Sequence, residues 1–143
     1  MKRILTLVLA ISFALTLNPP AHAGITTWRD TECRYQYLDG HRGWSTWEVK
    51  KTIVCATERW GVSTSTALYV ADRESNFGQY ATNRYSGACG VFQHMPAYWP
   101  GRVATVASAR PLLEPIGTSC YNARSNVLAA IWMARNGWGA WSL

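Results

Sequence analysis

Residues 63–78 read STSTALYVADRESNFG, and this stretch decides the fold because it encodes a helix whose apolar face ends on an acid. The four residues Ser63–Thr66 offer several side chains that can cap a helix N-terminus. Helical spacing then places on one inner face Ala67, Leu68, Val70 and Ala71. Glu74 follows Ala71 by three residues and Ala67 by seven, so it belongs to that same face.

Glu74 is therefore the position most informative about function. Acidic side chains are seldom buried without a reason, and partial burial disfavours the ionised form, as a general acid near neutral pH requires. The alternative is an acid at a frayed helix end that only pairs with Arg73 or Arg84. Helical spacing alone leaves both interpretations open.

Two further helices are predicted, one on either side of this stretch. Ser45-Thr46-Trp47-Glu48 has the form of a capping box, the helical spacing continues to Trp60, and Gly61 is placed to end the helix. A last helix is predicted over residues 123–135, with Asn136-Gly137 ending it.

The connecting segments are less regular. Residues 76–96 are rich in Gly, Asn, Ser and Tyr, which favours loops and a small β-element. Residues 24–43 are irregular, with one possible short strand at Arg34–Tyr37. Any long helix beyond position 95 is interrupted by Pro96, Pro100, Pro111 and Pro115. The predicted fold class is mainly α (of the α+β type), a compact helical domain with a small β-element.

The N-terminus has the features of a secretory signal peptide. Lys2 and Arg3 precede an apolar run of 14 residues, Ile4 to Leu17, and Ala21-His22-Ala23 has the small-x-small form of a cleavage site. A membrane anchor is the alternative, but a spanning helix needs roughly 20 apolar residues. We therefore predict that residues 1–23 are removed and that the protein is secreted.

Cleavage would leave 120 residues, which fits one compact domain. Loss of Lys2 and Arg3 lowers the formal net charge from +6 to +4. This modest positive charge suits attraction to an anionic cell wall. Nucleic acid is not an expected partner, because the chain has no basic run and an exported protein seldom meets it. A monomer is expected, since no clear excess apolar stripe remains for a partner.

All four cysteines follow the predicted cleavage site, and an even number in an exported chain indicates two disulfides. Of the three possible connectivities we predict the sequential one, Cys33–Cys55 and Cys89–Cys120. The first bridge would link an N-terminal segment, residues 24–44, to the main domain at residues 45–143. A zinc site is the competing interpretation, but no C-x-x-C pair occurs.

The segment that follows the acid carries a more specific pattern. Glu74-Ser75 ends the helix, and residues 86–96 read SGACGVFQHMP, followed by Tyr98-Trp99. In this pattern the chain resembles the lytic transglycosylases of the goose-lysozyme-like superfamily, whose signature joins a Glu-Ser pair to S-G-A-x-G-[LV]-[MF]-Q-x-M-P. The ending Gly137-Trp138-Gly139-Ala140-Trp141 is similar to small Gram-positive members and to resuscitation-promoting muramidases. The resemblance covers about residues 45–143 and implies a lysozyme-like fold.

The resemblance also implies roles for individual residues. Glu74 matches the catalytic glutamate, and Gln93 matches the residue whose amide contacts the substrate. Ser75 matches the serine beside the acid and is also a candidate for substrate binding, with a local hydrogen bond as the alternative. Tyr98 and Trp99 lie in the Pro/Gly-rich loop beyond the motif and are further candidates for substrate binding.

The chain departs from the family pattern at two places. His94 stands between the glutamine and the methionine of the motif, and it is expected to be solvent-exposed rather than to contact substrate. Relatives with this ending often have one cysteine just before the Glu-Ser pair and another at the extreme C-terminus. Here those places are taken by Arg73 and by Trp141-Ser142-Leu143, so the disulfide is expected to have moved.

The count of acids bears on the reaction. Glycosidases usually use two carboxylates, yet only Glu114 follows Glu74, and Asp72 should point off another helix face. The resemblance implies that one acid suffices: Glu74 protonates the glycosidic oxygen between MurNAc and GlcNAc, then acts as a base while the muramic 6-hydroxyl closes an anhydro ring. That chemistry needs no metal and no cofactor. The alternative is a hydrolytic muramidase with a second acid supplied by Asp30, Glu32 or Asp39.

A wall-binding module without turnover is a third interpretation. Eight tryptophans and seven tyrosines suit stacking on sugar rings, although most rings, Trp60 and Trp132 among them, are expected in the core. The presence of both Glu74 and Gln93 favours the enzyme.

Overall fold

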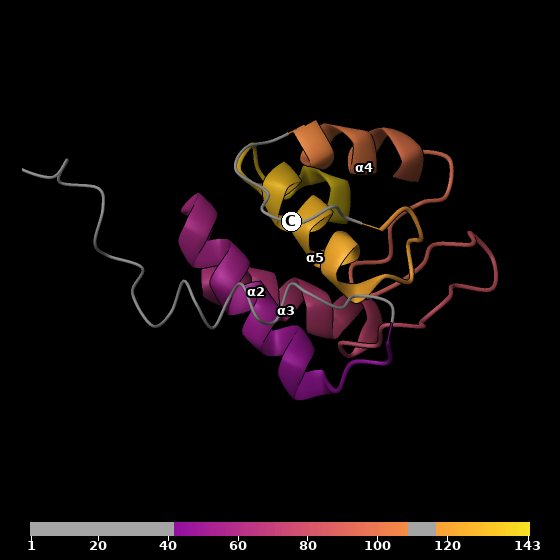
Figure 1. The fold of residues 1–143 in the computed structure, drawn as a ribbon, viewed down its shortest axis with the longest axis horizontal. Helices are drawn as coiled ribbons and strands as arrows, with labels where there is room; N and C mark the ends of the chain where they lie inside the picture. The colour runs from indigo at the N-terminus through magenta and orange to yellow at the C-terminus, as the bar shows by residue number, and fades with distance from the viewer. Residues whose placement is uncertain (1–41, 109–116) are drawn as a thin grey trace, which may run out of the picture.

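The computed structural model describes residues 42–108 and 117–143, and within these ranges the fold is a small bundle of helices. Its elements are α2 (Thr46–Trp60), α3 (Thr64–Ser75), α4 (Trp99–Ser108), α5 (Ala123–Ala134) and the short 3₁₀ helix η1 (Gly139–Trp141). The central helix α5 packs against both α2 and α4, and α3 packs against α2 (Figure 1). The predicted mainly helical fold is confirmed.

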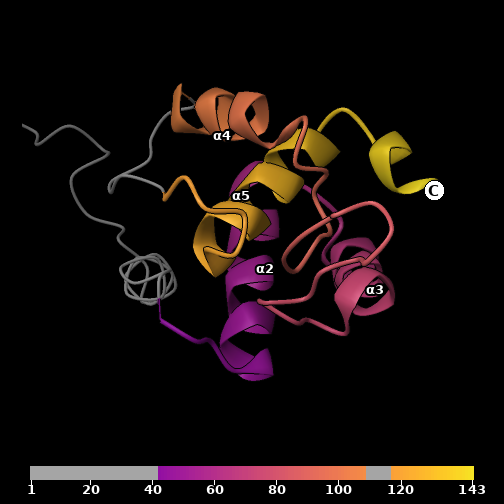
Figure 2. The same ribbon diagram turned by 90° about the vertical axis from the view of Figure 1, so that its right-hand side faces the viewer.

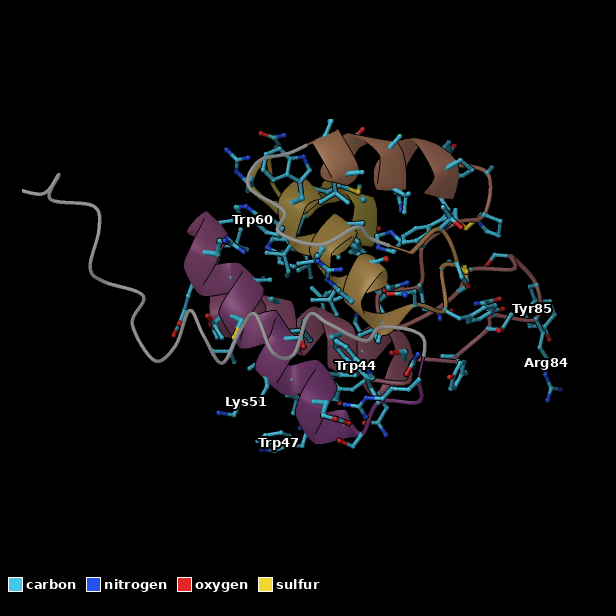
Figure 3. The ribbon with its side chains drawn as sticks, in the orientation of Figure 1. Trp44, Trp47, Lys51, Trp60, Arg84 and Tyr85 are labelled. Atoms are coloured by element: carbon cyan, nitrogen blue, oxygen red, sulfur yellow. A yellow bond between two sulfur atoms is a disulfide. The ribbon has the colours of Figure 1, made fainter. Side chains whose placement is uncertain are left out.

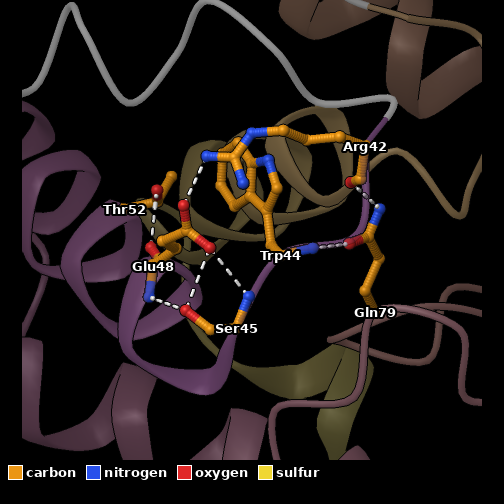
Figure 4. A network of polar contacts seen from close by, with 6 residues as sticks. All are labelled: Arg42, Trp44, Ser45, Glu48, Thr52 and Gln79. Atoms are coloured by element: carbon orange, nitrogen blue, oxygen red, sulfur yellow. Dashed lines mark hydrogen bonds and ion pairs between the residues drawn. The ribbon is translucent and has the colours of Figure 1, made fainter.

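The helix boundaries follow from the capping residues that the sequence predicts. Ser45 and Glu48 form the capping box of α2 (Figure 4). Gly61 ends that helix in the left-handed conformation at φ 66°. Ser63 caps α3 by accepting a hydrogen bond from the backbone N–H of Thr66. All three predicted helices are therefore present at the expected places.

The hydrophobic core surrounds α5. This helix is buried on nearly every side, and its apolar residues Val127, Leu128 and Ile131 pack with the inner faces of the neighbouring helices. Trp60, labelled in Figure 3, and Trp132 both pack against this core and lie edge to face with each other, with ring centroids 5.5 Å apart, which confirms their predicted packing role.

Helix α4 was not predicted from the sequence, because prolines occur at and around it. Pro100 is the second residue of this ten-residue helix. The first turn of a helix has no intrahelical partner for its N–H groups, so a proline there costs nothing and its fixed φ favours the helix. The prediction that Pro100 interrupts a helix was therefore wrong. Pro111 and Pro115 lie outside the described residues.

A long connection over residues 76–98 crosses from α3 to α4 and lies beside α5 (Figure 2). The expected β-element is reduced to two isolated bridges, from Cys89 to Thr82 and from Cys89 to His94. The disulfide Cys89–Cys120, with Cα atoms 6.0 Å apart, fixes the same point of the connection to the start of the α5 region. This half of the predicted pairing is confirmed.

The chain just before α2 is held by Gln79. The Gln79 side chain accepts a hydrogen bond from the N–H of Trp44 and donates to the carbonyls of Arg42 and Tyr121, at 2.7, 3.1 and 2.9 Å (Figure 4). Residues 1–41 lie outside the described residues, and with them the predicted signal peptide, Cys33 and the short strand. In the part of the chain that is described, no helix has the length and apolar character of a membrane span.

Candidate active site

The candidate site is built at the C-terminal end of α3. The helix ends where Asn76 and Phe77 both adopt left-handed backbone conformations, at φ 52° and 60°. A bulky residue such as phenylalanine rarely takes this conformation, which costs free energy and is found preferentially at functional sites. The strained turn follows Glu74 and Ser75 directly.

Glu74 lies on the face predicted for it and is half-buried, with 24% of its side chain exposed. Its Oε1 accepts a hydrogen bond from Nη2 of Arg73 at 2.9 Å, so the pairing partner is Arg73 and not Arg84. Within residues 42–108 and 117–143 no donor reaches Oε2. One carboxylate oxygen is therefore tethered, and the other is available to a substrate.

The arginine beside Glu74 makes a second contact that the sequence did not predict. Nη2 of Arg73 also donates to the backbone carbonyl of Trp141 in η1. Its hydrogen bond to Glu74 raises the pKa of the Arg73 guanidinium above its ordinary value. The C-terminal turn therefore touches the end of α3, and Figure 2 shows it on the α3 side of the molecule.

Ser75 connects α3 to residues 86–96, called here the motif segment. Its hydroxyl donates to the carbonyl of Val91 at 2.7 Å and accepts from the N–H of Gly78 at 3.0 Å. The hydroxyl is also 3.3 Å from the carbonyl of Ala71. These bonds occupy the hydroxyl inside the protein, so its geometry fits a residue that positions the site.

Gln93 ends the tight turn that starts at Gly90, and its own φ is 48°. Its side-chain Nε2 donates to the carbonyls of Ala81 and Gly90, at 3.1 and 2.8 Å. In the described part of the chain no group donates to its Oε1. The half-buried amide is thus held by its nitrogen and presents its oxygen as a free acceptor.

Asn126 is the supporting residue that sequence reasoning missed. This buried side chain accepts from the N–H of Phe92 at 2.8 Å and donates to the carbonyls of Cys89 and Cys120 at 3.1 and 2.8 Å. The backbone approaches so closely that a Cβ at Gly90 would lie 2.2 Å from its Nδ2. The available signal was a polar residue on the apolar face of a helix, as for Glu74.

His94 is buried, and the expectation that it is solvent-exposed was wrong. Its Nδ1 accepts a hydrogen bond from Arg102 at 2.8 Å, and its Nε2 donates to the carbonyl of Asn126 at 3.0 Å. Burial lowers the pKa of His94 to about 4, so the ring is neutral at neutral pH. The expectation failed because the motif alone does not show which residues surround His94. Arg102 and the carbonyl of Asn126 supply the hydrogen-bond partners that allow the ring to be buried.

The aromatic candidates divide by exposure. Tyr98 is 63% exposed, whereas Trp99 is 6% exposed and donates its indole N–H to the carbonyl of Thr118. We therefore place Trp99 in the core and keep Tyr98 as a candidate contact for sugar. Tyr80 and Tyr85 are also exposed on the connection over residues 76–98, and Figure 3 shows Tyr85 projecting from it.

No group of three or more metal-ligating side chains occurs among the residues that the structure describes. Two of the four cysteines are joined to each other, which removes them as zinc ligands. Contacts of Arg73 and Ser75 join the Glu74 carboxylate to the segment that carries the Gln93 amide, whereas Tyr80, Tyr85 and Tyr98 are candidates by their exposure alone.

Comparison with known proteins gives one family match. A family model described as the transglycosylase SLT domain matches residues 51–133, which is more than half of the chain. The matched segment spans α2 to α5 and includes Glu74, Ser75 and Gln93. No curated protein and no solved structure gives a significant match.

Proposed function

The chain belongs to the transglycosylase SLT domain family, and we propose that it is an exported enzyme that cleaves the MurNAc–GlcNAc linkage of peptidoglycan with Glu74 as its acid–base catalyst. The observation that carries this proposal is the state of the Glu74 carboxyl group. Its Oε1 is tethered to Arg73, while Oε2 has no protein donor among the described residues.

The proposed reaction uses one carboxyl group twice. Glu74 first gives a proton to the glycosidic oxygen, so that GlcNAc leaves as an alcohol while the muramic N-acetyl group assists at C1. The Glu74 carboxylate then removes the proton of the muramic 6-hydroxyl, whose oxygen bonds to C1 and closes the 1,6-anhydro ring. The proton returns to Glu74, no water is consumed, and the enzyme is regenerated without a cofactor.

Two of the other described acids, Asp72 and Glu48, do not offer a second catalytic carboxylate, which supports a single-acid mechanism. Asp72 is exposed and lies two residues before Glu74, which turns it to another face of α3. Both carboxylate oxygens of Glu48 are occupied by the capping box and by Arg42. The acids considered for a hydrolytic mechanism, Asp30, Glu32, Asp39 and Glu114, lie outside the described residues.

Substrate binding is assigned to the segment that faces the end of α3. The free Oε1 of Gln93 can accept a hydrogen bond from a sugar hydroxyl or N-acetyl N–H. Tyr98 offers an exposed ring for contact with the glycan. The Cys89–Cys120 disulfide that fixes this segment is typical of an oxidising compartment, which supports export and an extracellular or periplasmic location.

The test is digestion of purified peptidoglycan by the wild type, by Glu74→Gln and by Asp72→Asn, with the products identified by mass spectrometry. Asp72→Asn is the matched control because it removes one negative charge from an exposed position on the same helix. We expect anhydro-muropeptides from the wild type and the control, and a loss of at least about 100-fold with Glu74→Gln.

Each other outcome has a defined meaning. Reducing-end products would retain Glu74 but replace the transglycosylase by a hydrolytic muramidase. Equal product release by the wild type and Glu74→Gln would remove Glu74 from the mechanism. Retention of both proteins on the wall without any product would identify a glycan-binding module, as the exposed tyrosines would also permit.

A further inference from the structure

The residue before Glu74 holds two groups at once. A single nitrogen of Arg73, Nη2, donates to Oε1 of Glu74 and to the carbonyl of Trp141, which lies 68 residues further along the chain. An arginine nitrogen of this kind carries two hydrogens, so both donors are used. The carboxylate of Glu74 is thereby bridged to the backbone of the C-terminal turn.

The C-terminal turn is a firm support for this bridge. Trp141 is 6% exposed, and its indole N–H donates to the carbonyl of Phe92 at 2.8 Å. Its ring packs edge to face against Phe92 and Trp138, with centroids 6.0 and 5.3 Å away. The turn is therefore fixed to the same motif segment that carries Gln93.

Glu74 therefore lies between two residues that are each linked by hydrogen bonds to the segment that carries Gln93. Ser75, on one side, is bonded to the carbonyl of Val91. Arg73, on the other side, reaches the carbonyl of Phe92 through Trp141. Two ties of this kind restrict both translation and rotation of the helix end relative to the substrate segment.

We propose that Arg73 is a positioning residue that anchors Oε1 of Glu74 to the C-terminal turn, so that Oε2 is the oxygen that exchanges the proton with substrate. This inference rests on the function proposed above. It makes the turn Gly139–Trp141 a part of the catalytic machinery, although none of its side chains is assigned to contact the substrate.

A role in folding does not account for the contact. The Arg73 and Glu74 side chains are 37% and 24% exposed, and exposed ion pairs contribute little to stability. The guanidinium instead holds Oε1 of Glu74 at 2.9 Å and so acts directly on the carboxylate. It also limits that carboxylate to one orientation, which is the contribution that a precisely placed catalyst needs.

The experiment measures kcat and KM on soluble peptidoglycan strands for the wild type, Arg73→Gln, Arg73→Lys and Arg59→Gln. Arg59 is the matched control because it is an exposed arginine in the last turn of another helix. We expect Arg73→Gln to lower kcat about 10- to 100-fold with KM changed less than about twofold. Arg73→Lys should recover a substantial part of the activity because it keeps the charge and the donors.

One further readout separates positioning from a structural effect. Trp141→Phe removes the indole N–H that binds Phe92, and it should lower kcat in the wild type but not further in Arg73→Gln. Circular dichroism at the assay temperature establishes that each variant is folded.

The outcomes distinguish this inference from the proposed function. If Glu74→Gln is inactive while Arg73→Gln keeps the wild-type kcat, Arg73 is not a positioning residue and the proposed function stands. Additive effects of Arg73→Gln and Trp141→Phe would exclude coupling through the C-terminal turn. If Glu74→Gln is as active as the wild type, both proposals fail together.

Discussion

Replacement of Asn126 by alanine is the sharpest test of how the candidate site is supported. The Asn126 amide joins α5 to both ends of the Cys89–Cys120 disulfide and to the N–H of Phe92. Alanine removes all three hydrogen bonds and leaves one N–H and two carbonyls in a buried environment. The segment that presents Gln93 then loses its main polar attachment to the core helix.

The expected loss of stability follows from these three bonds. Each buried hydrogen bond contributes about 1 kcal/mol net, so Asn126→Ala should cost about 3 kcal/mol. For a domain of this size, 1 kcal/mol corresponds to roughly 4 °C in Tm, which gives a decrease of about 12 °C. Because the attached segment carries Gln93, activity should fall further than the unfolded fraction explains.

Asn122→Ala is the matched control, since it removes a second buried asparagine from the same helix. Asn122 only caps α5, accepting from the N–H and hydroxyl of Ser125, and its loss should cost about 1 kcal/mol. Urea denaturation with equal m-values measures both differences. A cost for Asn126→Ala no larger than that for Asn122→Ala would refute the assigned role of the three hydrogen bonds.

Three other changes have expected outcomes. Gly90→Ala should cost about 3 kcal/mol or more of stability, because a Cβ would lie 2.2 Å from Asn126 Nδ2 and Gly90 has a φ of 76°. Gly101→Ala should instead stabilise the protein by about 0.5–1 kcal/mol, because Gly101 faces open space in α4. Thermal melting compares the two variants, and equal Tm values would contradict the packing around Gly90. His94 has a pKa of about 4 in the folded state against 6.5 in the unfolded chain. Its contribution to the free energy of unfolding, roughly 3 kcal/mol, is therefore complete above pH 6.5 and is lost as the pH falls toward 4. Urea denaturation between pH 7.5 and 4.5 should show this loss of stability, and the same loss in His94→Gln would assign it to another group. Replacing Cys89 and Cys120 together by serine should lower the free energy of unfolding by about 3.5 kcal/mol, because the disulfide closes a loop with a sequence separation of 31 residues. If reducing agent leaves the Tm of the wild type unchanged, the disulfide does not contribute this stability.

The local features of the fold could be predicted because each depends on a few adjacent residues. The capping box at Ser45, the N-cap near Ser63 and the spacing that puts Glu74 on an apolar face are all visible in short windows. Helix α4 was missed because proline was counted without regard to its position in the first turn. Proline does interrupt the interior of a helix, but applying this rule to Pro100 required knowing that the helix begins at Trp99.

The polar contacts that support the site were not predictable in this way, because they join residues distant in sequence. Asn126 reaches back 34 residues to Phe92, and His94 finds its partner in Asn126 at a separation of 32. A motif shows that polar residues stand there but not which groups face them. The burial of His94 is the direct result, since its two ring nitrogens are satisfied by groups from α4 and α5.

Arg73 shows how such a contact can change the meaning of a departure from a pattern. The family pattern that the sequence resembles leads us to expect cysteines before the Glu-Ser pair and at the C-terminus, and here Arg73 occupies the first of these places. The structure joins Arg73 to the carbonyl of Trp141, so the two regions remain linked, by a hydrogen bond instead of a disulfide. A disulfide would fix only the distance between the two backbones. The arginine also places a positive charge 2.9 Å from Oε1 of Glu74, so the residue that links the two regions also contacts the carboxylate.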